Sequence, residues 1–276
     1  MPAPALKTID VGNGQTISYR EAGSGTPLVI LHGLGGRSDS WVPQYENLSD
    51  TYRVIGWDAP GYGGSSEMPG DAPEVPEYAE VAMRFVDALE IDRCHLVGHS
   101  VGTCIAARFH QAYPDRMLSL TLAEAVIGNG ESSDEEKQKM LDGRAKDLAE
   151  MGAAGFAEKR TPNSLSPDAD PDAVTAAVDF AKGMQIPGYL KLFGALVRAN
   201  MFEYVEPLRV PAMIVAGSDD KSAPEEFVRQ IAEAYPGIRY EIIDGIGHQI
   251  AFEKPELFVN LLRHHLEASE AALAGG

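Results

Sequence analysis

A serine flanked by glycines is the first feature of this sequence that could do chemistry. Ser100 is the central residue of the pentapeptide 98–102, GHSVG, which follows the apolar run 94–98 and precedes an apolar stretch of helical character. A sharp turn from a strand into a helix strains the backbone of its central residue and makes that side chain project alone. We therefore predict that Ser100 is a nucleophile. The alternative is an ordinary glycine-rich turn between a strand and a helix.

A serine hydroxyl is a weak nucleophile that needs a base, and the base needs an acid to orient it. The chain has seven histidines. His248 differs from the others because it lies in a late loop punctuated by glycine, the segment 244–248 with the sequence DGIGH, which follows a predicted strand. Such a loop can carry a side chain over the edge of a sheet. We predict that His248 is the general base.

Two carboxylates could orient His248. Asp220 closes the segment 217–220, GSDD, after an apolar strand, and Glu124 directly follows another strand. We prefer Asp220, because the order Ser100, Asp220, His248 matches the order of nucleophile, acid and base in one large fold family. A role in a turn or a helix cap is the alternative for Asp220. Glu124 remains open as the acid.

A glycine-rich loop could bind a developing oxyanion. The segment 32–36, HGLGG, follows the predicted strand 27–31, and its glycines allow backbone N–H groups to turn toward a ligand. The amides of Leu34 and Val101 could together stabilise a tetrahedral oxyanion, typically by about 3–4 kcal/mol for each donor. A plain glycine-rich turn is the alternative.

Five further residues are candidates for contact with a substrate. Gly33 belongs to the glycine-rich loop, His99 lies inside the serine turn, and Trp41 follows the loop in sequence. A core contact is the equal alternative for Trp41. Arg144 and Arg160 could pair with an acidic substrate, although solvated surface charge is the default interpretation of both.

Alternating strands and helices must position these groups. Short runs rich in Val, Ile and Leu are typical of strands covered on both faces. Their alternation with helices indicates an α/β fold with a mostly parallel central sheet flanked by helices. The predicted strands are 18–21 in a hairpin, 27–31, 52–57, 94–98, 118–123, 212–216 and 239–243. The predicted helices are 78–89, 102–113, 224–235 and 256–268.

The alternation of strands and helices lapses between residues 126 and 205. Helical stretches in this region are separated by breaks that contain Gly and Pro, and they are 134–149, 173–182 and 189–200. We predict that 126–205 forms a helical lid, or cap, inserted after the sixth strand. The core then consists of 1–125 and 206–276.

Composition and charge exclude several classes of protein. The chain has 276 residues and carries 23 Lys and Arg against 41 Asp and Glu, a net charge of −18. This balance argues against a nucleic-acid partner, which needs clustered cations. Two cysteines cannot form a disulfide framework. No residues show the spacing of metal ligands, and no loop shows a phosphate-binding or dinucleotide-binding signature, so we predict neither metal nor cofactor.

The chain also gives no reason to expect a membrane partner. It shows neither a signal peptide nor an apolar run of about 18 residues, so we expect a cytoplasmic protein. The oligomeric state stays open between a monomer and a homodimer.

The sequence resembles the α/β-hydrolase superfamily over nearly its whole length. The resemblance implies the fold of that superfamily, a structural turn at 58–65, and Ser100, Asp220 and His248 as its catalytic residues. The segment after Ser100 and the stretch 152–160 are similar to the 3-oxoadipate enol-lactonase branch. The matching pieces are HG at 32–33, DAPGYGGS at 58–65, GHSVG at 98–102, GSDD at 217–220 and GH at 247–248.

These residues predict a cofactor-independent serine hydrolase that cleaves a small-molecule carboxylic ester or lactone through an acyl-enzyme. One alternative is a carbon–carbon bond hydrolase or another non-ester enzyme of this fold, such as a perhydrolase. Gln249 disfavours carbon–carbon hydrolysis, because many such enzymes have Trp after the base. The other alternative is a receptor that keeps the fold, and an intact set of nucleophile, acid and base argues against it.

Overall fold

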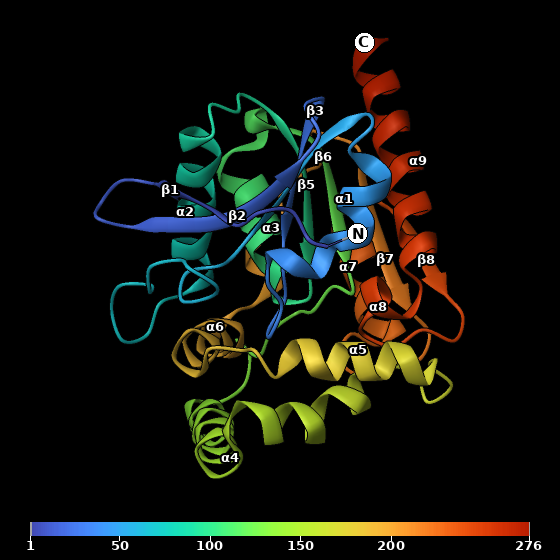
Figure 1. Cartoon of the computed structure of the whole chain (residues 1–276). Helices are drawn as coiled ribbons and strands as arrows, with labels where there is room; N and C mark the ends of the chain where they lie inside the picture. The colour runs from blue at the N-terminus through green and yellow to red at the C-terminus, as the bar shows by residue number, and fades with distance from the viewer. Residues whose placement is uncertain (1, 276) are drawn as a thin grey trace.

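An eight-stranded sheet forms the centre of the computed structural model, which describes residues 2–275 (Figure 1). The strand order is β1-β2-β4-β3-β5-β6-β7-β8. β2 pairs antiparallel with β1 and with β4, and all other neighbours are parallel, so the predicted α/β fold with a mostly parallel sheet is confirmed. The strands are β1 Lys7–Asp10, β2 Thr16–Ala22, β3 Thr26–Leu31, β4 Tyr52–Trp57, β5 Cys94–His99, β6 Met117–Ala123, β7 Ala212–Gly217 and β8 Arg239–Ile243.

The two faces of the sheet bury different residues of the same strand. In β3, Val29 and Leu31 belong to one apolar cluster, whereas Leu28 and Ile30 belong to the other. Successive side chains of a strand point to opposite faces. A strand covered on both faces is therefore apolar at most positions, which explains the nearly continuous apolar runs in the sequence, and buried polar residues such as His95 and Ser119 hydrogen-bond each other.

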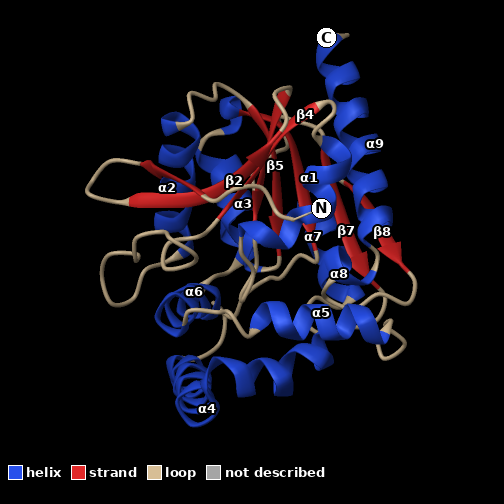
Figure 2. Ribbon diagram, in the orientation of Figure 1, coloured by secondary structure: helices blue, strands red, loops and turns tan. Residues whose placement is uncertain are grey.

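Helices cover both faces of the sheet (Figure 2). α2, α3 and α7 contribute buried residues to the cluster of Val29, and α1, α8 and α9 contribute to the cluster of Leu28. α2 begins three residues before the predicted start at residue 78, because Glu74 and Glu77 form a capping box there. The helices are α1 Val42–Leu48, α2 Val75–Ala88, α3 Val101–Ala112, α7 Glu225–Ala234, α8 Ile250–Glu253 and α9 Pro255–Ala274.

The chain between β6 and β7 is helical and lies at the carboxyl ends of the strands (Figures 1 and 2). Its α4 continues past the predicted end at residue 149 through a kink at Gly152, whose φ of 64° and ψ of 178° are not helical. Glycine adopts such a positive φ without a steric penalty, so the helix resumes after the kink. The elements are α4 Asp134–Arg160, η3 Thr161–Ser164, α5 Pro171–Ala181, α6 Ile186–Arg198 and η4 Met201–Tyr204.

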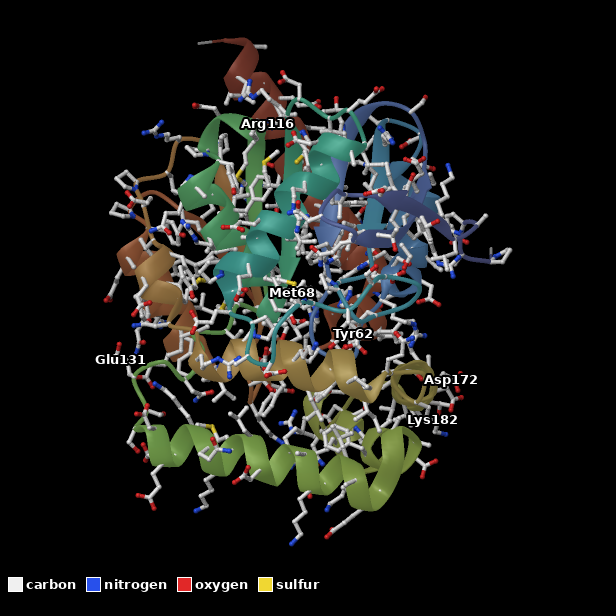
Figure 3. The ribbon with its side chains drawn as sticks, turned by 90° about the vertical axis from the view of Figure 1, so that its left-hand side faces the viewer. Tyr62, Met68, Arg116, Glu131, Asp172 and Lys182 are labelled. Atoms are coloured by element: carbon white, nitrogen blue, oxygen red, sulfur yellow. The ribbon has the colours of Figure 1, made fainter. Side chains whose placement is uncertain are left out.

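Close contacts fix this helical segment against the sheet and its loops. A Cβ at Gly188 would lie 2.0 Å from the carbonyl oxygen of Gly61, so α6 approaches the turn after β4 at a distance that only glycine permits. Near this contact, the Lys191 ammonium donates to the Met68 carbonyl oxygen at 2.7 Å. Figure 3 shows Met68 and Tyr62 directly above the ribbon of α6. These contacts therefore hold the helical segment at the carboxyl ends of the strands.

Cys94 and Cys104 are both buried and free. No helix within residues 2–275 is long and apolar enough to cross a membrane. Within the same residues, no group of three or more His, Cys, Asp and Glu side chains could hold a metal ion.

Candidate active site

Ser100 lies in the turn between β5 and α3, at the carboxyl end of a central strand. Its φ of 54° and ψ of −124° are strained for a residue that carries a side chain. Two glycines make the turn possible. A Cβ at Gly98 would lie 2.3 Å from the carbonyl oxygen of Gly102, and a Cβ at Gly102 would lie 2.3 Å from that of Leu31. The sharp turn expected around Ser100 is therefore present.

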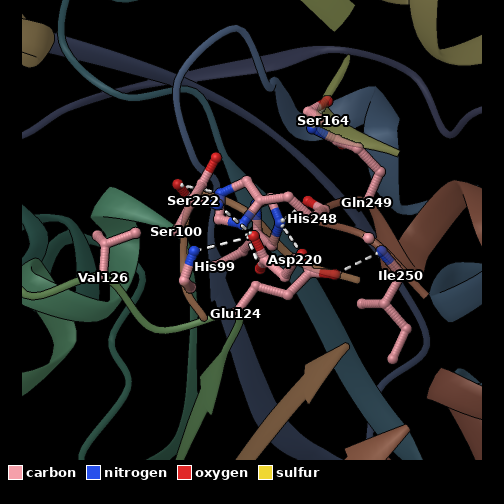
Figure 4. A network of polar contacts seen from close by, with 12 residues as sticks. His99, Ser100, Glu124, Val126, Ser164, Asp220, Ser222, His248, Gln249 and Ile250 are labelled. Atoms are coloured by element: carbon pink, nitrogen blue, oxygen red, sulfur yellow. Dashed lines mark hydrogen bonds and ion pairs between the residues drawn. The ribbon is translucent and has the colours of Figure 1, made fainter. Parts of the chain in front are cut away.

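Hydrogen bonds join Ser100 to His248 and His248 to Asp220 (Figure 4). The Ser100 hydroxyl oxygen lies 2.9 Å from His248 Nε2, and His248 Nδ1 lies 2.6 Å from Asp220 Oδ2. With Nδ1 protonated, His248 donates to the carboxylate, and its Nε2 accepts the serine proton. The backbone N–H groups of Ser222 and Ala223 donate to Asp220 Oδ1 at 2.8 and 2.9 Å. Ser100, Asp220 and His248 are all more than nine-tenths buried.

The charge of Asp220 controls the protonation of His248. Burial lowers the pKa of His248, but the hydrogen bond to Asp220 and its negative charge outweigh burial, so the pKa lies above the ordinary 6.5. Burial also raises the pKa of Asp220, but the hydrogen bond and charge of His248 and the N–H donors of Ala223 and Ser222 together outweigh burial, and the pKa lies below 3.8. Asp220 is therefore ionised at neutral pH, where it can stabilise an imidazolium.

We expect activity to fall in acid with a midpoint above pH 6.5. His248 can accept the Ser100 proton only in its neutral form, so kcat/KM should be full above the pKa of His248 and be lost as pH falls through it. The measurement is kcat/KM for a neutral ester from about pH 5 to 9. The variant Asp220→Asn should lower the midpoint, because it removes the charge that raises the pKa of His248. A midpoint that stays in place would contradict this coupling.

Glu124, the other carboxylate that could orient the base, contacts a different histidine. It is fully buried, its Oε2 bonds His99 Nε2, and its Oε1 accepts from the backbone N–H of Ile250 at 2.7 Å (Figure 4). Its φ of 52° is a strained conformation for a non-glycine residue. The His99 and His248 ring centroids are 5.5 Å apart. Glu124 therefore contacts a histidine that neighbours the predicted base, and not the base itself. The residue bonded to His248 Nδ1 is Asp220.

Glu253 holds the loop that carries His248, and no pattern in the sequence singled it out. Its carboxylate accepts hydrogen bonds from the backbone N–H groups of Ser166, Gly247 and Gln249 at 2.8, 3.0 and 3.1 Å. Burial raises the pKa of Glu253 above its ordinary 4.5, although these hydrogen bonds oppose the rise. A glutamate on a four-residue helix looks like a surface residue in sequence, so only the folded chain reveals this contact.

The predicted oxyanion loop lies directly against Ser100. A Cβ at Gly33 would lie 2.6 Å from the Ser100 Cβ, so only glycine lets the loop come this close. His32 Nδ1 donates to the Gly33 carbonyl oxygen at 2.7 Å, and its Nε2 accepts from the Ala59 N–H at 2.9 Å. Burial lowers the pKa of His32 to about 4, so this ring is neutral and fixes the loop.

Two backbone donors beside Ser100 are available to a ligand. Val101 is the first residue of α3, where a backbone N–H has no partner within the helix. Leu34 lies in the loop next to Gly33. Neither N–H has an acceptor among residues 2–275. Both could therefore donate to an oxyanion that forms at Ser100.

A cavity of about 640 Å³ lies over Ser100, between the sheet and the helical segment. Four of the five residues predicted to contact a substrate line it: Trp41 and His99 from the side of the sheet, and Arg144 and Arg160 from α4. Gly33 is not among the lining residues and lies against Ser100. The helical segment also lines the cavity with polar residues, Asn129, Thr161, Asn163 and Ser164. Its apolar lining residues are Val126, Ile127, Phe156, Ala177, Phe180, Ala181, Met184, Tyr189, Phe193 and Leu196.

Comparison with known proteins identifies the fold. The family described as alpha/beta hydrolase fold matches residues 26–168. A curated relative, (E)-2-((N-methylformamido)methylene)succinate hydrolase of Acinetobacter baylyi, is 24% identical, with 95% of this chain and 98% of that protein covered. A thermophilic esterase from Thermogutta terrifontis has a TM-score of 0.85 at 22% identity, covering 96% of this chain and 99% of that one. The enol-lactonase of Burkholderia xenovorans LB400 has a TM-score of 0.83 at 23% identity, covering 94% and 99%.

At these identities the solved structures establish a shared fold, which extends over nearly the whole chain. The family match covers more than half of the 276 residues, and it includes both the glycine-rich loop 32–36 and the turn at Ser100. The chain therefore belongs to the α/β-hydrolase fold family.

Proposed function

We propose that this protein is a serine hydrolase that cleaves a carboxylic ester or a lactone through an acyl-enzyme. The observation that carries the proposal is the continuous series of hydrogen bonds from Asp220 through His248 to Ser100, which ends at a cavity. A nucleophile, a base and an orienting acid in that order are the groups that acyl transfer requires.

The proposed reaction begins when Ser100 Oγ attacks the carbonyl carbon while His248 Nε2 removes the hydroxyl proton. The carbonyl oxygen becomes an oxyanion, which the N–H groups of Leu34 and Val101 stabilise. The carbon–oxygen bond to the leaving group then breaks, and the leaving oxygen takes the proton from His248. The acyl group remains on Ser100 as an ester.

Water completes the reaction. His248 Nε2 removes a proton from a water molecule, whose oxygen attacks the acyl carbon of the ester on Ser100. The second tetrahedral intermediate collapses, Ser100 Oγ regains a proton from His248, and a carboxylic acid is released. Asp220 keeps its charge throughout and stabilises each imidazolium that forms.

We propose that the helical segment 126–205 is a lid that covers the cavity at Ser100. Its apolar side chains would exclude bulk water from the cavity and strengthen the electrostatic contacts at Ser100. We propose accordingly that 1–125 and 206–276 form the catalytic core.

The test is covalent labelling with a fluorophosphonate, followed by mass spectrometry of the peptide that contains Ser100. We expect one phosphonyl group per chain, on Ser100, and a loss of ester hydrolysis in proportion to labelling. The variant His248→Ala should slow labelling, because the hydroxyl then lacks its base. Inactivation without a label on Ser100 would contradict the proposal. Turnover of a vinylogous diketone above that of esters and lactones would assign the site to carbon–carbon hydrolysis instead.

A further inference from the structure

The charges around the cavity differ in sign from the charge of the whole chain. Three formally charged side chains line the cavity, Arg144, Arg160 and Lys221, and all three are cations. Among residues 2–275, no Asp or Glu lines it. The chain as a whole has 41 acidic residues against 23 basic ones. A cavity whose only formally charged lining residues are cations, in so acidic a protein, points to a negatively charged ligand.

Arg144 is the cation that the structure holds most firmly. Its guanidinium carbon lies 4.0 Å from the ring centroid of Phe193 on α6, 5.3 Å from that of Phe156, and 5.6 Å from that of Tyr189. It also donates a hydrogen bond to the Tyr189 hydroxyl. The three rings are more than nine-tenths buried. Aromatic faces attract a guanidinium, so these contacts restrict Arg144 to one region of the cavity wall.

Arg144 forms no ion pair within residues 2–275, although its positive charge acts on the Asp147 carboxylate at longer range. Asp147, one turn along α4, bonds to Arg160 at 2.9 Å instead. No Asp or Glu oxygen in the part of the chain that the structure describes lies within ion-pair distance of Arg144. The Tyr189 hydroxyl is a neutral acceptor, so the positive charge of Arg144 remains available to the cavity. Arg160 already has a partner, and its side chain is 51% exposed.

We infer that the substrate of this hydrolase bears a carboxylate that Arg144 binds while the scissile carbonyl lies at Ser100. This inference rests on the proposed function of Ser100. A planar guanidinium matches the two oxygens of a carboxylate with parallel hydrogen bonds. α4 lies on the side of α6 away from the sheet in Figure 1, and Arg144 of α4 and Ser100, which follows β5, both line the cavity. The carboxylate and the ester or lactone carbonyl must therefore be separate groups of one substrate.

The test compares esters that differ only in this charge. One pair places the charge in the acyl group: 4-nitrophenyl hydrogen glutarate and its methyl ester. A second pair places it in the leaving group: 4-carboxyphenyl acetate and its methyl ester. For at least one pair, we expect wild-type kcat/KM to favour the anion by about 10-fold or more, since a charge-assisted hydrogen bond typically contributes that much. Added NaCl should reduce this preference.

Arg144→Gln should reduce the ratio of anionic to neutral kcat/KM by about 10- to 100-fold, mainly through KM. Arg144→Lys, which keeps the charge but loses the planar fork, should fall between this variant and the wild type. Lys146→Gln is the matched control, because it removes one positive charge from an exposed position on the same helix. Its ratio should equal that of the wild type.

The outcomes separate this inference from the proposed function. If neither member of either pair is hydrolysed and Ser100 resists a fluorophosphonate, the proposed function is wrong. If the neutral esters are hydrolysed but the wild type shows no preference for either anion, the carboxylate assignment is wrong. The proposed hydrolase function is then unaffected. An equal loss for both members of each pair in Arg144→Gln would also overturn the assignment, because it would make Arg144 a purely structural residue.

A binding measurement supports the test if Arg144→Gln does not fold. Glutarate should inhibit hydrolysis of the neutral ester by the wild type competitively, and its uncharged analogue glutaramide should inhibit at least about 10-fold more weakly. Equal inhibition by the two compounds would contradict a carboxylate site.

Discussion

Replacing Ser100 by Ala should lower kcat for ester hydrolysis by on the order of 10⁵- to 10⁶-fold. Without the hydroxyl there is no acyl-enzyme, and only the oxyanion donors and substrate binding can still assist direct attack by water. The measurement is steady-state hydrolysis of a neutral 4-nitrophenyl ester, together with the burst that reports the acyl-enzyme. The variant should show neither a burst nor a fluorophosphonate label.

Ser222→Ala is the matched control for this experiment. It removes another hydroxyl from the same cavity but keeps the backbone N–H that donates to Asp220 at 2.8 Å. Its turnover should stay close to that of the wild type. If Ser100→Ala retained turnover comparable to that of Ser222→Ala, Ser100 would not be the nucleophile.

Replacing Asp220 by Asn should lower kcat by about 10³- to 10⁴-fold, the second largest effect that we expect. The amide cannot stabilise the imidazolium, and it can hold His248 in the tautomer that presents N–H, rather than a lone pair, to Ser100. The shape of the side chain is nearly unchanged, so the free energy of unfolding should change much less than the activity. The measurements are kcat with a neutral ester and urea-induced unfolding.

Glu124→Gln is the comparison that separates the two carboxylates. Its side chain bonds His99 and the Ile250 N–H, so the structure predicts a smaller loss of activity than for Asp220→Asn. It should instead lower the free energy of unfolding by about 1–3 kcal/mol, the typical cost of disturbing a buried charged hydrogen bond. A larger loss of kcat in Glu124→Gln than in Asp220→Asn would make Glu124 the acid.

Much of the fold can be predicted from the sequence because short-range rules produce it. The strands from β3 to β7 lie between helices, so both of their faces are mostly apolar, and they appear as nearly continuous apolar runs. The helical segment was less predictable in detail. Gly152 looks like an end of α4, but the packing of the segment lets the helix resume and carries Arg160 to the cavity.

Parts of the candidate site can also be predicted because they depend on residues that are close together in the sequence. The turn at Ser100 needs small residues two positions before and after it, because the following helix folds back onto the strand that precedes it. The glycines around Ser100 and at Gly33 are therefore visible in the sequence. Glu253 has no such signature, because its role depends on which backbone N–H groups the fold brings to it.

The sequence alone determined the set of reactive groups: a serine in a strained turn, a histidine in a late loop, two possible acids and a loop of free amides. Each follows from the steric and hydrogen-bonding preferences of neighbouring residues. Only the tertiary structure shows that Asp220 contacts His248 while Glu124 contacts His99, because these contacts depend on how β6, β7 and β8 pack side by side. Packing likewise brings three cations and no carboxylate to the cavity of an acidic chain, since net charge is a sum over residues and carries no information about position.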